Sequence, residues 1–138
     1  MKRVTWASIS IAMLLACVLF IDCATTQEAT WKTLPEITKT TYEQSWSIVV
    51  GVITEKYDLE ITDAASGYLR TAWKVKKDFL NQDDSRTRIS VRLESKTPLK
   101  FKIRAEKEAK NLADEWTPKG NDEQLEKAML EELSARLK

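Results

Sequence analysis

The sequence is poor in the residues on which most enzyme and metal sites depend. Its 138 residues include no histidine, two cysteines, three glycines and three prolines. Without an imidazole the chain lacks the usual general base and a common metal ligand, and no serine stands in an SxxK pattern that would supply a lysine instead. Three glycines also argue against a glycine-rich phosphate loop. We therefore expect no enzymatic activity, no metal site and no cofactor.

Charges of one sign are not in excess either. The chain has 22 lysine and arginine residues against 21 aspartate and glutamate residues, a net charge of +1. So small a charge gives no general attraction to nucleic acid, and we expect no nucleic-acid partner. The hydrophobic fraction of 43% and the charged fraction of 31% are ordinary for a globular protein, and the length suits one folded domain.

The N-terminus has the pattern of a secretory signal. Lys2 and Arg3 precede an apolar run over residues 4–16 that ends in a small residue. Residues 14–17, Leu-Leu-Ala-Cys, resemble the lipobox of bacterial lipoproteins, in which a small residue precedes the cysteine that receives the lipid. The resemblance implies that Cys17 carries the lipid anchor and is the first residue of the mature protein.

Two alternatives for this segment stay open. Cys23 is followed by the polar start that mature lipoproteins often have, although Asp22 fits the lipobox poorly. Residues 4–21 are also just long enough to span a bilayer as an uncleaved anchor. All three interpretations place the rest of the chain outside the cytoplasm, because Lys2 and Arg3 hold the N-terminus inside. We divide the chain into a signal and lipobox region (1–23), a tether (24–38) and one domain (39–138).

Apolar spacing predicts two helices in the domain. In residues 41–57 apolar side chains recur every three or four positions, with Thr40 or Thr41 as the N-cap. Gly51 inside this helix predicts close packing or contact with a partner. Residues 122–137 carry leucine or methionine at every fourth position, with Asn121 as the expected N-cap.

Between the helices the apolar period changes to two. This pattern predicts four antiparallel strands, at residues 59–62, 68–76, 86–95 and 99–105. The segment with Trp31, Leu34 and Ile37 is a candidate edge strand or extended arm before the first helix. The order helix, four strands, helix predicts an α+β fold in which both helices pack on one face of an antiparallel sheet.

Part of this domain is similar to a known family. Residues 42–46, 57–61 and 63–73 resemble the helix-grip domain of BamC/NlpB-type outer-membrane lipoproteins, in which a tryptophan-bearing helix leads to a strand, an acidic-to-glycine turn and a strand that ends near a tryptophan. The resemblance implies a non-enzymatic scaffold or adaptor in an envelope protein complex, with outer-membrane assembly as its process. Other helix-grip folds hold ligands, so the alternative is a binding module for a small, lipidic or anionic envelope ligand.

Lysine and arginine concentrate in the predicted strands. Residues 68–104 hold eleven of them against four acidic residues. Strand alternation predicts a basic open face on the sheet, either solubilising or a docking surface for an acidic partner. The predicted docking residues are Arg70, Lys74, Arg88, Arg92, Lys100, Lys102 and Arg104.

Aromatic side chains are expected mostly inside the domain. Trp73 shares strand parity with Leu69, Thr71 and Val75, which predicts that it faces the helices. For Trp31 and Trp116 a core position is favoured over an exposed anchor. We expect Tyr68 to be the one aromatic residue on the open face.

The expected location is the periplasmic face of the cell envelope, through a lipid anchor. Val18 follows Cys17, where enterobacterial lipoproteins retained at the inner membrane carry an aspartate. This favours the outer membrane over the inner membrane.

Overall fold

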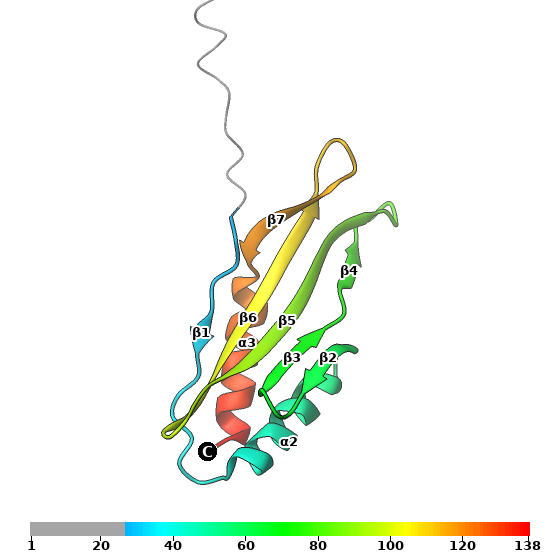
Figure 1. Cartoon of the computed structure of the whole chain (residues 1–138). Helices are drawn as coiled ribbons and strands as arrows, with labels where there is room; N and C mark the ends of the chain where they lie inside the picture. Colours follow the sequence, from blue (N-terminus) through cyan, green and yellow to red (C-terminus); the bar gives the residue numbers. More distant parts are fainter. Residues whose placement is uncertain (1–26) are drawn as a thin grey trace, which may run out of the picture.

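A computed structural model describes residues 27–138 (Figure 1). The predicted signal and lipobox region, with Cys17 and Cys23, lies outside the described residues. The elements are β1 (Lys32–Thr33), α2 (Tyr42–Thr54), β2 (Leu59–Asp63), β3 (Tyr68–Thr71), β4 (Lys74–Lys77), β5 (Asp83–Lys96), β6 (Leu99–Lys110), β7 (Trp116–Asn121) and α3 (Glu123–Arg136).

The fold is α+β, as the sequence predicts, but the sheet is larger than expected. It has seven antiparallel strands rather than four, with β1, β6, β5, β3 and β2 side by side. Strand β4 pairs with β5 beyond the end of β3, and β7 pairs with β6 beyond β1. The long central hairpin of β5 and β6 therefore carries a pair of shorter strands along each of its edges (Figure 1).

Capping side chains define where the two helices begin. The Thr41 hydroxyl accepts a hydrogen bond from Gln44 N at 3.3 Å while the Gln44 side chain accepts from Thr41 N at 3.1 Å, so the predicted capping box is confirmed. For α3 the expected N-cap is wrong by one residue. Asp122 is the N-cap and accepts from Leu125 N at 3.1 Å, because Asn121 still belongs to β7.

The predicted strand 68–76 is interrupted by an extra residue. Arg70 lies opposite Ser90 and Lys74 opposite Thr87, so three residues of one strand face two of the other. The Thr71 hydroxyl accepts the hydrogen bond of Ile89 N at 3.0 Å, in place of a backbone carbonyl. Such a bulge reverses the alternation of side chains beyond it. The prediction that Trp73 and Val75 face the helices is therefore wrong, and Val75 is exposed.

Strand β7 was not expected from the sequence. Pro118 and Gly120 obscure any alternation, and proline is tolerated here because β7 lies at the margin of the sheet. The second half of the predicted tether also joins the sheet. Leu34 N donates to Phe101 O at 2.8 Å and Ile37 N to Leu99 O at 3.0 Å, and both apolar side chains are buried.

The core lies between one face of the sheet and both helices, with α3 behind the central strands in Figure 1. Trp46 of α2 fills the space against the sheet, with its ring centroid 6.2 Å from that of Phe101 and 6.3 Å from that of Tyr42. The fully buried side chains that meet here come from α2, β3, β5, β6 and α3. They include Val49, Ile53, Leu69, Ile89, Val91, Phe101, Ile103 and Leu133.

Two glycines differ in what a methyl group would meet. Gly67 has a φ of +67°, and a Cβ added there would lie 2.6 Å from Leu93 Cβ. Gly51 on α2 is exposed, and no atom lies within 4 Å of its added Cβ. Close packing within the described chain therefore does not explain Gly51.

We predict opposite effects of alanine at these two positions. Gly67→Ala should lower the free energy of unfolding by about 2–3 kcal/mol, from backbone strain and the clash with Leu93. Gly51→Ala should raise it by about 0.5–1 kcal/mol, because alanine favours the helix. Urea denaturation of both variants beside the wild type measures the difference, and a shared direction of change would contradict it.

Candidate functional site

The open face of the sheet carries a layer of aromatic and charged side chains. Within residues 27–138 no helix covers this face, because both helices pack on the other side. We call this layer the Trp–Arg face. It consists of Trp31, Trp73, Trp116, Arg70, Arg86, Arg88, Arg92, Lys102, Arg104, Glu60, Glu94, Glu106 and Glu108.

Two tryptophans enclose an arginine at the β4 end of the face. The guanidinium carbon of Arg86 lies 4.5 Å from the ring centroid of Trp73 and also 4.5 Å from that of Trp116. The guanidinium of Arg88 covers Trp73 at 4.4 Å. These distances are those of cation–π contacts, which hold both the rings and the arginines in place. The bulge between β3 and β4 produces the arrangement, because it turns Trp73 to this face.

A third tryptophan lies at the β1 edge. Trp31 precedes β1, and the guanidinium carbons of Arg92 and Arg104 lie 4.5 and 4.6 Å from its ring centroid. Trp31, Trp73 and Trp116 are all half-buried. The expected core positions of Trp31 and Trp116 are therefore wrong. The expectation that Tyr68 is the only aromatic residue on this face is wrong as well.

Carboxylates neutralise much of the predicted basic surface. Glu106 lies between Arg88, at 2.5 Å, and Arg104, at 3.2 Å. The hydrogen bond from Arg88 to Glu106 raises the pKa of Arg88, and a hydrogen bond from Lys102 lowers the pKa of Glu94. Further ion pairs join Arg86 to Glu108 and Arg70 to Glu60. Six cations thus face four carboxylates, a local balance of +2.

The structure places most of the predicted docking residues together, with one exception. Arg70, Arg88, Arg92, Lys102 and Arg104 belong to the Trp–Arg face. Lys100 lies opposite Ser95 near the β5–β6 turn, where its charge also lowers the pKa of Glu94. Lys74 lies on the other side, where its Nζ donates to Lys56 O at 3.3 Å and covers the Tyr57 ring. The bulge before β4 again accounts for the error.

Arg92 differs from its neighbours in charge pairing. Its side chain is exposed, and no residue in the described part of the chain forms an ion pair with it. Two polar atoms under the layer also lack a hydrogen-bond partner among residues 27–138. They are Ser90 Oγ and Arg104 Nε, which belong to directly opposed residues of β5 and β6. Buried polar groups are nearly always hydrogen-bonded, so unpaired groups here point to an incomplete surface.

Sequence reasoning missed several members of this face. Arg86 has the same strand parity as Arg88, and Glu106 and Glu108 have that of Arg104, so a longer β6 would have included them. The tryptophans gave no such signal. Trp31 lies before a two-residue strand, and Trp73 lies in the irregular segment between β3 and β4.

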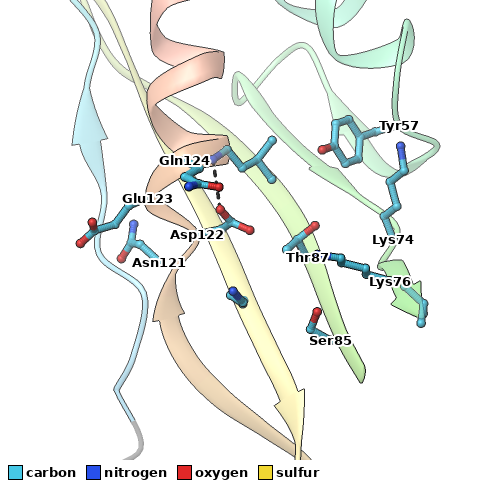
Figure 2. Close-up of a pocket in the computed structure, with 12 residues that line it drawn as sticks. Tyr57, Lys74, Lys76, Ser85, Thr87, Asn121, Asp122, Glu123 and Gln124 are labelled. Atoms are coloured by element: carbon cyan, nitrogen blue, oxygen red, sulfur yellow. Dashed lines mark hydrogen bonds between the residues drawn. The ribbon is translucent and has the colours of Figure 1, made fainter. Parts of the chain in front are cut away.

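A polar depression lies on the other face of the sheet, beyond the ends of the helices (Figure 2). Its volume is about 670 Å³. Figure 2 shows Tyr57 and Lys74 on one side of it and the start of α3 with Asp122 on the other. Burial, followed by the charge of Asp122, raises the pKa of Tyr57. Its lysines are Lys74, Lys76 and Lys107, and its carboxylates are Asp122 and Glu123. The carboxylates offset much of the positive charge, and the depression is open to solvent.

We predict that the Trp–Arg face depends on Glu106 for its stability. Glu106→Gln leaves Arg88 and Arg104 without a carboxylate, where the paired Arg88 and Glu106 side chains are only 20% and 17% exposed. The free energy of unfolding should fall by about 1–3 kcal/mol. Glu131→Gln is the matched control, because Glu131 is 70% exposed and lies 4.0 Å from Lys127. Equal denaturation midpoints for the two variants would contradict the prediction.

Neither protein-family models nor curated proteins provide a match for the chain. In the part of the chain that the structure describes, neither helix is long and apolar enough to cross a membrane. The resemblance to BamC/NlpB-type lipoproteins therefore rests on residues 42–73 of the sequence, and what it implies about function is a proposal.

Proposed function

We propose that the protein is a membrane-anchored envelope lipoprotein that acts as a non-enzymatic adaptor and docks a protein partner on the Trp–Arg face. The observation that carries the proposal is the set of three half-buried tryptophans stacked on arginines on a sheet face that no described helix covers. Tryptophan and arginine are the residues most enriched at the energetic centres of protein interfaces.

The charges of the face favour a partner with exposed carboxylates. Cations exceed carboxylates by two, and Arg92 is exposed without an ion pair in the described chain. An acidic side chain of the partner would complete the pairing that the chain leaves open. Nucleic acid is a poor alternative, because the arginines already cover the tryptophan rings on which bases would stack.

The alternative function, a helix-grip ligand module, has less support. That hypothesis needs a cleft between α2 and the sheet, and Trp46 fills this space against Phe101 and Tyr42. The depression in Figure 2 lies outside it and has nearly balanced charges. The proposed process remains outer-membrane assembly, which only the resemblance to the BamC/NlpB-type family supports.

The lipid anchor is tested first. Metabolic labelling with palmitate should be lost in Cys17→Ser and kept in Cys23→Ser, because Cys17 is the cysteine of the proposed lipobox. The reverse pattern would assign the anchor to Cys23. Absence of label in the wild type, with residues 1–21 still present in the intact mass, would instead identify an uncleaved membrane span.

The docking surface is tested by crosslinking in cells. A photo-crosslinking residue in place of Arg92, in the full-length protein, should capture one partner, whereas the same residue in place of Glu131 on α3 should not. We expect the captured peptide to contain aspartate or glutamate, since Arg92 is the cation that lacks a carboxylate.

A charge exchange separates specific docking from accidental capture. Arg92→Glu should weaken binding, and replacement of the captured carboxylate by lysine should restore it. Arg92 is exposed, so thermal stability should be unchanged. Crosslinks of equal yield at Arg92 and Glu131, or failure of the exchange to restore binding, would move the interface elsewhere.

A further inference from the structure

Three large apolar side chains are exposed at the tips of two loops. In the β4–β5 loop, residues 78–82, Phe79 is 93% exposed and Leu80 61% exposed. In the β6–β7 loop, residues 111–115, Leu112 is fully exposed. Single exposed apolar residues are common on protein surfaces, but large ones gathered at one place mark a binding surface.

The two loops lie at the same end of the molecule. Ser85 near the start of β5 lies opposite Ala109 near the end of β6, so the loops that adjoin these positions flank each other. Figure 1 shows both loops at one end of the sheet, with the β5–β6 turn and the C-terminus at the other. The apolar tips therefore form one patch at one end, which we call the loop patch (Phe79, Leu80 and Leu112).

Internal hydrogen bonds hold both loops in shape. The Asp78 carboxylate accepts from Leu80 N at 2.8 Å and from Gln82 N at 3.0 Å. In the other loop the Asn111 side-chain oxygen accepts from Ala113 N at 2.9 Å and from Glu115 N at 3.0 Å. The backbone is thus satisfied within each loop, while the apolar side chains of the loop patch point away from the core. Such loops are built to present these side chains outward.

The chain enters the domain at this same end. Gln27, the first described residue, forms a β-bridge with Lys119 of β7, and β7 runs from there back to the β6–β7 loop. At about 3.3 Å per residue, the five steps from Lys119 to Asp114 span no more than about 17 Å. The loop patch is therefore close to the point where the proposed anchor segment joins the domain.

The length of that segment keeps the loop patch near the membrane. The ten residues from Cys17 to Gln27 reach at most about 35 Å, and the four from Cys23 at most about 14 Å. A tether this short raises the local concentration of bilayer at the loop patch, so that a few apolar side chains are enough for binding.

We infer that the loop patch inserts into the surface of the bilayer that holds the N-terminus, and so fixes the orientation of the domain on the membrane. The inference rests on the membrane anchor of the proposed function. The charges near the two tips identify the kind of lipid. Lys76, Lys77 and Lys110 are outnumbered by Asp78, Asp83, Asp84, Asp114 and Glu115. Attraction to anionic headgroups does not explain binding, so the apolar side chains must act on a zwitterionic surface.

The experiment uses the full-length lipidated protein in vesicles of phosphatidylcholine that contain a phosphatidylcholine with a diazirine in its acyl chain. After illumination, mass spectrometry locates the lipid adducts. We expect adducts in residues 78–82 and 111–115 in addition to residues 1–26. Label confined to residues 1–26, with the protein still floating with the vesicles, would overturn the inference and leave the anchor intact.

Variants provide the quantitative control. Because both loops insert together, Phe79→Ser with Leu80→Ser should lower the label in the other loop, residues 111–115, by about fivefold or more. Ile61→Ser is the matched control, because Ile61 is 37% exposed but lies on β2. It should leave the label unchanged, and an equal loss in both variants would contradict insertion.

The remaining outcomes are also decisive. A protein that does not float with the vesicles would overturn both the anchor and the insertion. If the loops acquire no lipid adduct in vesicles but are protected from a water-soluble modifier in cells, a protein partner covers the loop patch, and insertion into lipid is wrong.

Discussion

The pairing of β5 with β6 is the constraint on which the rest of the structure depends. Eleven residue pairs join the two strands, from Ser85 opposite Ala109 to Lys96 opposite Leu99. Because alternate side chains point to opposite faces, this one register builds the apolar core on one side and the Trp–Arg face on the other. A slip by one residue would exchange the two faces, so the apolar core and the docking surface are specified together.

The proposed contacts divide the molecule into regions that do not compete. The helices take one face of the sheet, a protein partner takes the other, and the membrane takes the end with the loop patch. With that end in the bilayer, the strands rise away from the membrane and the Trp–Arg face points sideways along its surface (Figure 1). A partner in the same membrane, or extending from it, would then reach the face without displacing the domain.

The parts of the fold that follow from local patterns could be predicted. The apolar spacing of α2 and its capping box, and the alternation of Ile89 and Val91 in β5, depend on neighbours within a few residues. The position of Trp73 depends instead on a bulge at Thr71, whose hydroxyl replaces a backbone acceptor of the neighbouring strand. Nothing in the alternation of residues 68–76 indicates that extra residue. The neutralisation of the basic face was missed for a related reason, because Glu106 lies beyond the predicted end of its strand.

The way β1 joins the sheet determines how the domain responds to force. Thr30 and Asn121 exchange hydrogen bonds through backbone and side chain, and Leu34 N bonds to Phe101 O further along. A pull on the anchor segment acts along β1 and loads these bonds at the same time, in shear, instead of opening them one after another. Strands loaded in shear resist separation better than strands that are peeled apart. The attachment is thus suited to a domain held between a moving bilayer and a bound partner.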